Sequence, residues 1–401
     1  MEKAAKSKEM DMLNGGIAGK LILFAIPLAF SSILQQLFNS ADVAVVGRFA
    51  GDTVLAAVGS CVALVGIFVN LIVGLSVGPN AALATLIGQK KREQINDMLH
   101  TILTFGAVLG LLLMCLGMLS ARVILELSGT PESVMSQALL YIRIYFLSIP
   151  FMVIYNFGSA ILRSFGDSRR PDEFQFRFRD MKIEKNALKK VLAIGIPAGI
   201  QGAIFSVSNV FIQSGINSFG ENAIAGSSLA LNFEYFTYDI ASAFAQTAVT
   251  FTSQNYGAGN VKRCKKVFWL CLLFGFGFTE ILAIVFMIWD DFFVSIYTTS
   301  SAVAVYGLIR MHHVCSLEGL TATYEVESSA LRGMGKSLEP SIITILGTVV
   351  FRLIWMVTVF KWIPTYDMLM NVYLASWIFT GGAIFIVYWH HMKKVSKYGI
   401  H

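Results

Sequence analysis

The ten residues at 162–171, LRSFGDSRRP, recur at 331–340 as LRGMGKSLEP, so an LRxxGxSxxP pattern appears twice at an offset of 169. Five identical positions in ten are hard to obtain by chance. The same offset, within one residue, relates other pairs, among them Ile26-Pro27 with Ile196-Pro197, Asn39 with Asn209, Gly88 with Gly257, and Tyr155 with Tyr324. The repeat predicts that one set of helices occurs twice in the chain.

Apolar segments occupy most of the chain around these two copies. The 401 residues are 55% hydrophobic and 14% charged, against about 25% charged in a typical soluble domain. Runs such as Leu21 to Val46 exceed the roughly 20 residues that span the hydrocarbon core of a bilayer, and they lack the period-two alternation of a membrane barrel. The composition excludes a water-soluble enzyme and predicts an all-α, multi-pass integral membrane protein.

Ten segments have the length and composition of membrane-spanning helices. We expect these helices at Leu21–Val46, Leu55–Thr85, Ile102–Val123, Ala138–Leu162, Val191–Ile216, Ala223–Val249, Val267–Ile288, Ala302–Ala330, Ile342–Trp362 and Met368–Trp389. The first segment is too long for a signal peptide and lacks a small-residue cleavage site, so we expect it to stay in the protein.

Lys and Arg cluster in every second loop and at both ends of the chain. The clusters are the N-terminal tail, Lys90 to Arg92, Arg163 to Lys190, Lys262 to Lys266, Arg332 with Lys336, and Lys393 to Lys397. Because basic loops stay on the cytoplasmic side, we expect both termini in the cytoplasm and the protein in the inner membrane. The formal charge of +6 therefore reflects topology, and no nucleic-acid partner is expected.

The two halves are expected to run in the same direction. An even number of spans separates equivalent positions, so an axis along the membrane normal relates the halves. We predict two helical bundles around a central cavity, with an N-terminal bundle at 1–171, a basic cytoplasmic linker at 172–190 and a C-terminal bundle at 191–401. Two spans follow Pro340, whereas charged residues follow Pro171 directly. The first half thus lacks one helical hairpin.

At these residues the chain resembles the multidrug and toxin extrusion (MATE) family of cation-coupled antiporters, particularly its bacterial DinF-like members. The family has twelve helices in two bundles of six, so the resemblance implies a chain of four plus six helices that lacks helices five and six. The matching segments are Ile26-Pro27, Leu37 to Asp42, Val46 to Arg48, Leu162 to Pro171, Gly195 to Gly199, Gln254 to Gly259, and Leu331 to Gly335.

Asp42 is the leading candidate for ion coupling. Gln35, Asn39 and Asp42 follow steps of four and three and form a polar stripe on the first helix. Their oxygens suit Na⁺, and a buried carboxylate can carry a proton instead. The repeat partner of Asp42 is Ile212, so only the first copy of the repeat carries a charge at this position. An interfacial Asp near Arg48 is the alternative.

Acids in later helices are candidates for a substrate cavity, because ionisable groups at bilayer depth are costly. Glu234 lies one turn from Tyr238, where a lipophilic cation would find a carboxylate beside an aromatic face. Glu325 is the repeat partner of Asn156, so this position is polar in both halves. A charge pair between Glu325 and Arg332 is the alternative. Asn209, the partner of Asn39, completes this expected set.

Several other polar groups are expected to have structural roles. Asp239 suits interhelical hydrogen bonding, Glu280 suits a packing contact, and His312-His313 lacks a third ligand at helical spacing. The five cysteines have no metal-binding spacing, and no nucleotide-binding or hydrolase motif occurs. We therefore expect no catalytic residues, no metal site and no cofactor beyond the coupling ion.

These observations and the resemblance together predict a secondary antiporter that exports small cationic or amphipathic organic compounds, such as drugs and toxins, in exchange for Na⁺ or H⁺. Its partners would be organic cations and the lipid bilayer, and it would act as a monomer. A lipid-linked saccharide flippase is the alternative within transport, and a non-transporting membrane scaffold is the alternative outside it. The flippase requires a cavity lined with several cations, whereas most intramembrane charges here are acids.

Overall fold

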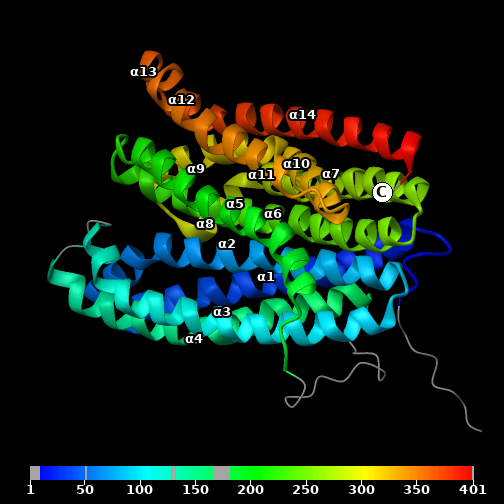
Figure 1. The fold of residues 1–401 in the computed structure, drawn as a ribbon. Helices are drawn as coiled ribbons and strands as arrows, with labels where there is room; N and C mark the ends of the chain where they lie inside the picture. The colour runs from blue at the N-terminus through cyan, green and yellow to red at the C-terminus, as the bar shows by residue number, and fades with distance from the viewer. Residues whose placement is uncertain (1–9, 50–51, 128–129, 131, 167–180, 400–401) are drawn as a thin grey trace, which may run out of the picture. The chain divides into compact units, whose positions relative to one another are not determined.

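The structure is a computed structural model that describes residues 10–49, 52–127, 130, 132–166 and 181–399. These residues form helices joined by short connections, with no strand among them (Figure 1). The side chains of residues 39–49, 52–60, 62, 63, 127, 133 and 398 lie outside the described part. The prediction of an all-α protein is confirmed.

Each of the ten predicted spans coincides with helical structure. The long helices are α1 (Ala18–Phe49), α2 (Asp52–Gly88), α3 (Arg92–Leu127), α4 (Glu132–Phe165), α5 (Lys185–Asn217), α6 (Glu221–Gly257), α7 (Val261–Ile288) and α14 (Tyr366–Tyr398). Within the described residues, eight spans are long and apolar enough to cross a membrane by length and composition. The protein is therefore a multi-pass membrane protein.

Two of the predicted spans are interrupted. The segment 302–330 forms α9 (Ser301–Val314), a 3₁₀ turn (Cys315–Leu317) and α10 (Gly319–Gly333). The segment 342–362 consists of α11 (Leu338–Thr344), a π-helical turn (Ile345–Val350), α12 (Phe351–Val357) and α13 (Val359–Trp362). A short helix, α8 (Asp290–Tyr297), precedes α9.

The connection between α4 and α5 is too short to contain the helical hairpin found at the equivalent place in the second half. Helix α4 ends at Phe165 and α5 begins at Lys185, whereas two spans need about 20 residues each. Residues 167–180 of the predicted linker lie outside the described residues. The division into four plus six spans stays a prediction.

Contacts divide the chain into two compact units. Unit 1 comprises Met1–Gly15, Leu37–Ala203 and Ser253–Ala258, and unit 2 comprises Gly16–Gln36, Ile204–Thr252 and Gly259–His401. These units cut through α1, α5 and α6, so they are not the segments 1–171 and 191–401 expected from the repeat. The latter boundaries stay a prediction.

Unit 1 is held by apolar packing and by close approach of helices. Helices α2, α3 and α4 surround a core that includes Phe146 and Phe157. The first half of α5 packs on α2 through glycines, and a Cβ on Gly78 would collide with the carbonyl oxygen of Val191. Small residues let helix backbones meet closely in membranes, where packing replaces the hydrophobic driving force.

Equivalent residues of the two repeats contact each other in unit 1. Gly88 of α2 and Gly257 of α6 are repeat partners, and so are Thr85 and Gln254. A Cβ on Gly88 would collide with the carbonyl oxygen of Gln254, and one on Gly257 with that of Thr85. Each helix therefore presents the same glycine to the other, as expected for equivalent helices related by an approximate two-fold axis.

The glycines of the LRxxGxSxxP pattern end two equivalent helices. Gly166 follows α4 with φ 77°, and Gly335 follows α10 with φ 81°. A residue in this left-handed region closes a helix, and glycine adopts it without steric cost. This explains why the pattern retains glycine in both copies.

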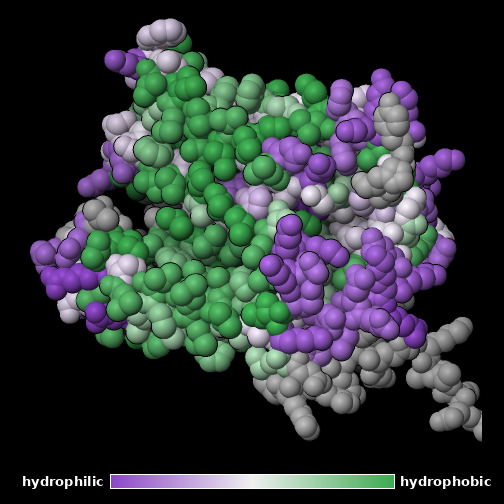
Figure 2. All heavy atoms as spheres, in the orientation of Figure 1, coloured by the Kyte–Doolittle hydropathy of each residue, from purple (hydrophilic) through white to green (hydrophobic). Residues whose placement is uncertain are grey.

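Unit 2 contains the N-terminal part of α1, the C-terminal part of α5, most of α6, and α7 to α14. Helix α10 packs on α7 and α14, and α14 packs on α9. One apolar cluster joins Phe233, Phe286 and Met311 from three of these helices. On the visible face, hydrophobic side chains cover the middle of the helices and hydrophilic ones gather toward their ends (Figure 2).

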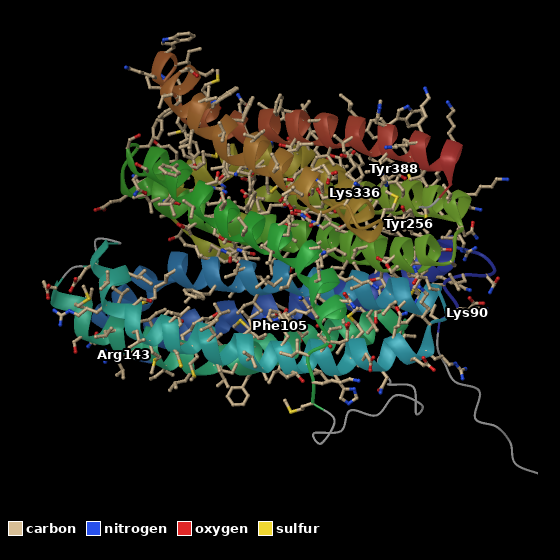
Figure 3. The ribbon with its side chains drawn as sticks, viewed as in Figure 1. Lys90, Phe105, Arg143, Tyr256, Lys336 and Tyr388 are labelled. Carbon is tan, nitrogen blue, oxygen red and sulfur yellow. The ribbon has the colours of Figure 1, made fainter. Side chains whose placement is uncertain are left out.

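Basic side chains lie toward both ends of the helices in unit 1. Lys90, in a predicted cytoplasmic loop, and Arg143 of α4 lie toward opposite ends, with Phe105 between them (Figure 3). Leu119 and Phe151 are 83% and 74% exposed, which suits contact with lipid tails. The apolar band between polar ends is the arrangement a membrane protein requires.

Candidate functional site

A buried ion pair lies inside unit 2 between α6 and α9. Arg310 donates from Nε to Glu234 Oε1 at 2.5 Å and from a terminal nitrogen to Oε2 at 2.7 Å. Its other terminal nitrogen donates to Ser227 Oγ at 2.6 Å. Both charged side chains are nearly inaccessible to solvent. The bidentate geometry and the third hydrogen bond satisfy the guanidinium, which offsets much of its cost of burial.

A second buried guanidinium lies nearby. Arg352 of α12 has its Cζ 4.7 Å from the centroid of the Tyr373 ring, and Arg310 has its Cζ 5.3 Å from the same centroid. Tyr373 belongs to α14. Cation–π attraction to one ring therefore links two arginines that would otherwise repel each other in a low dielectric.

A buried acid and a helix break adjoin this pair. Thr237, one turn from Glu234 on α6, donates to Glu318 Oε2 at 2.6 Å. Glu318 lies in the break between the 3₁₀ turn and α10, where Gly319 N–H donates to Glu280 Oε2 at 2.9 Å. Glu280 therefore caps the start of α10. Such caps satisfy backbone donors that a helix start leaves unpaired.

Tyr238 and Glu325 meet across α6 and α10. The Tyr238 hydroxyl donates to Glu325 Oε1 at 3.0 Å. The sequence placed Tyr238 with Glu234, but the structure brings it to Glu325, because Glu234 lies with Arg310. Glu327, two residues further along α10, is also buried, and its Oε2 has no hydrogen-bond partner within the described part of the chain.

The predicted substrate residues occupy both units. Within unit 2, Glu234 lies in the buried ion pair, and the half-buried Tyr238 and Glu325 bond to each other. Exposed Asn209 accepts a hydrogen bond from Arg352 at 3.3 Å. Asn156 lies in unit 1, where its amide donates to the carbonyl oxygen of Met152 in the same helix at 2.9 Å. The structure thus brings four of the five residues into one unit.

The predicted ion-coupling residues lie along α1. Gln35 is exposed. Asn39 and Asp42 belong to the same helix, but their side chains lie outside the described residues. Their role in coupling stays a prediction.

Sequence reasoning missed Arg352 and Tyr373 as members of this network. Arg352 carried a usable signal, since an arginine within the apolar run 342–362 marks a functional position by default. Tyr373 carried none, because aromatic residues are common throughout these helices. Arg310 was not predicted as the partner of Glu234, because the two residues lie on different helices and 76 residues apart in sequence.

Histidines and acids pair at the ends of unit 2 without forming a metal cluster. His312 Nε2 lies 2.6 Å from Asp290 Oδ2, and His313 Nε2 lies 3.6 Å from Asp367 Oδ1. Over the described ranges, no group of three or more His, Cys, Asp or Glu side chains suits a metal ion.

An all-helical membrane bundle with a buried charged network defines a class of protein, the multi-pass membrane transporters, because ionisable residues inside a membrane mark solute or ion pathways. The particular family follows from comparison with known proteins. The MatE family model matches residues 27–171 and again 197–358. The chain belongs to the multidrug and toxin extrusion (MATE) family, and the two matches correspond to the two halves of the repeat.

Named relatives and solved structures agree with this assignment. The chain is 24% identical over 383 residues to the probable multidrug resistance protein YoeA of Bacillus subtilis, covering 80% of this chain and 82% of the relative. It is 21% identical over 393 residues to the probable multidrug resistance protein NorM of Thermotoga maritima, covering 84% of each. The fold matches an outward-facing multidrug resistance MATE family transporter of the MOP superfamily at a TM-score of 0.89 and 18% identity, covering 98% of this chain and 99% of that one.

The assignment makes the protein a multidrug efflux transporter, since MATE proteins are transporters and not enzymes. The comparisons do not favour the flippase or the scaffold considered from sequence.

Proposed function

We propose that the protein is a secondary antiporter that exports small cationic or amphipathic organic compounds in exchange for Na⁺ or H⁺. It would act as a monomer in the inner membrane with both termini in the cytoplasm. The observation that carries the proposal is the network of buried charges in unit 2, within a member of a transporter family. Charges inside a membrane bundle are costly, and they often mark the pathways of ions or solutes.

Coupling is assigned to α1. Asp42 would take up Na⁺ or a proton, and Asn39 and Gln35 on the same stripe would add oxygen ligands. Ion binding and substrate binding then favour different conformations. Binding of the ion therefore promotes release of the substrate, and binding of the substrate promotes release of the ion.

The substrate is assigned to Glu234, Tyr238, Asn209, Asn156 and Glu325. Within this set, Glu325 beside the Tyr238 hydroxyl offers a carboxylate next to an aromatic ring, which suits a lipophilic cation. Glu234 is held by Arg310 in this conformation. A cation reaches Glu234 only in a conformation in which that pair has opened.

The coupling assignment is tested in proteoliposomes with the substitution Asp42→Asn. The change keeps the shape of the side chain and removes its charge. We expect gradient-driven export of a fluorescent cation to fall at least about 10-fold, because a neutral amide neither titrates nor balances the charge of Na⁺. A Na⁺ gradient and a pH gradient are imposed separately to identify the coupling ion.

Glu126→Gln is the matched control, since Glu126 is an exposed acid that pairs with Arg122 at the end of α3. It removes one negative charge and should export at the parental rate. If Asp42→Asn also exports at the parental rate under both gradients, the coupling assignment is wrong and Asp239 and Glu325 become the residues to test.

A further inference from the structure

Among the described side chains, Arg352 is a buried guanidinium without an acidic partner. Its side chain is 1% exposed, yet it forms no ion pair within the described part of the chain. Nε donates to Ser376 Oγ at 3.2 Å, and one terminal nitrogen donates to Asn209 Oδ1 at 3.3 Å. The other terminal nitrogen, NH2, has no hydrogen-bond partner among the described residues.

The contrast with Arg310 shows what is missing. Arg310 is equally buried, but each of its three guanidinium nitrogens donates a hydrogen bond, two of them to Glu234 and one to Ser227. Arg352 has only neutral acceptors at long distances, and leaving a buried charge unpaired is strongly unfavourable. A guanidinium in this position is complementary to an oxyanion that the protein itself does not supply.

The surroundings of Arg352 provide aromatic walls. Its Cζ lies 4.7 Å from the Tyr373 ring centroid and 5.5 Å from that of Phe205. Tyr373 is buried, whereas Phe205 on α5 is half-buried. A flat aromatic body entering beside Phe205 therefore finds ring faces next to the charge.

Asn209 of α5 links Arg352 to an exposed side chain. It accepts a hydrogen bond from Arg352 and is itself exposed. The proposed approach to the guanidinium is therefore from the side of Asn209. Rotation of the Asn209 amide would release one terminal nitrogen, which together with NH2 presents two parallel N–H donors.

We propose that Arg352 recognises an acidic group, a carboxylate, sulfonate or phosphate, on an aromatic amphipathic compound carried by this protein. The acid takes both terminal nitrogens in the bidentate geometry that guanidinium favours, and the aromatic body packs beside Phe205 and Tyr373. This inference rests on the proposed function, because it treats the ligand as exported cargo. It extends that cargo from cations to compounds with an acidic head.

The test uses purified full-length protein and three probes with one aromatic body. These are 2-naphthylacetate, its neutral amide 2-naphthylacetamide, and the cation 2-naphthylethylammonium, with binding followed by equilibrium dialysis and thermal stabilisation. We expect the parent to bind the acid at least about 10-fold more tightly than the amide, and Arg352→Gln to abolish that preference. Binding of the cation by Arg352→Gln should be no weaker than binding by the parent.

Two further variants keep the result interpretable. Arg352→Lys retains the charge but loses the two parallel N–H donors of the guanidinium, so it should keep only part of the preference for the acid. If Arg352→Gln does not fold, the preference measured for Arg352→Lys tests the proposal. Arg122→Gln removes an exposed arginine at the end of α3 and should leave the preference unchanged.

A preference for the acid that survives in Arg352→Gln, or one absent from the parent, overturns the proposal. Repeating the measurements in sodium chloride and in sodium gluconate separates cargo from a free inorganic anion. Chloride stabilisation that Arg352→Gln loses, without a preference for 2-naphthylacetate, would assign the position to a counter-ion and reject the cargo. Binding is measured without a gradient, so a failure of coupling through Asp42 does not affect the outcome.

Discussion

Unit 1 places no Asp, Glu, Lys or Arg among its most buried described side chains, whereas unit 2 buries Glu234, Arg310, Glu318, Glu327, Arg332 and Arg352. Glycines and apolar side chains hold the helices of unit 1 together. In unit 2, hydrogen-bonded charges join helices in addition to apolar packing. The interior of unit 1 therefore serves mainly packing, and that of unit 2 carries the chemistry the structure describes.

The repeat makes this difference informative, because equivalent positions started from one sequence. Asn156 in unit 1 bonds within its own helix, while its partner Glu325 in unit 2 bonds to Tyr238 on another helix. The two halves have kept the same helix ends and the same crossing glycines. Their interior polar groups have diverged, as expected if scaffold and site are under different constraints.

Breaking the buried pair of unit 2 should give the largest effect. Arg310→Gln leaves the Glu234 carboxylate buried without its counter-charge, so we expect a loss of about 3–5 kcal/mol in the free energy of unfolding. Denaturant unfolding in detergent measures it. Arg122→Gln breaks an exposed pair instead and should cost less than about 1 kcal/mol. Equal losses in the two variants would refute the special role of the buried pair.

Overpacking the helix crossing of unit 1 should give the next largest effect. Gly78→Val places a branched side chain against the carbonyl oxygen of Val191, and we expect a loss of at least about 1–3 kcal/mol because the backbones must separate. Gly66→Ala on the same helix is the control, since a Cβ there meets nothing within 4 Å. A tolerated Gly78→Val, judged by thermal unfolding, would mean that this crossing is loose.

Removing the cap of α10 should have a smaller effect. Glu280→Ala removes the carboxylate that accepts from Gly319 N–H, and a lost helix cap costs about 0.5–2 kcal/mol. Glu280→Gln retains an acceptor oxygen and should recover part of the stability. If the Ala and Gln variants unfold at the same temperature as the parent, the break before α10 is held by packing alone.

The smallest effect is expected at the start of α5 in unit 1, where Glu184 caps the helix. Its carboxylate accepts from Asn186 N–H at 3.0 Å and Ala187 N–H at 2.5 Å, and these bonds lower the pKa of Glu184 below its usual value. A lowered pKa stabilises the folded state above the usual pKa, and this contribution disappears as the pH falls through the lowered value. The parent should therefore exceed Glu184→Gln in thermal midpoint at pH 7 and approach it as the pH falls through the lowered pKa. A difference that stays constant with pH would contradict the role of the charge.

The sequence predicted the fold well because its signals are local or repeated. Apolar length and the distribution of Lys and Arg mark the spans, and the offset of 169 marks the duplication and the absent hairpin. It did not predict the breaks before α10 and after α11. The first depends on Glu280, a residue of another helix, and on the packing of Gly319 against Phe276.

The candidate site was predicted only in part. Composition and the high cost of intramembrane charge singled out Glu234 and Glu325, and the repeat singled out Asn209. The partners of all three lie on other helices, at Arg310, Tyr238 and Arg352. Helical spacing pairs residues one turn apart, so it joined Glu234 to Tyr238 and had no means of pairing across helices.

The sequence by itself determined that this chain is a duplicated, membrane-spanning bundle with one hairpin fewer in its first half, because hydrophobic length, loop charge and internal repetition are properties of the chain in order. Only the tertiary structure decided which buried charges neutralise each other and which one is left over. Ion pairing depends on distances of a few ångströms between side chains more than 70 residues apart. That is why Arg310 is satisfied by Glu234 and Arg352 is left with neutral acceptors.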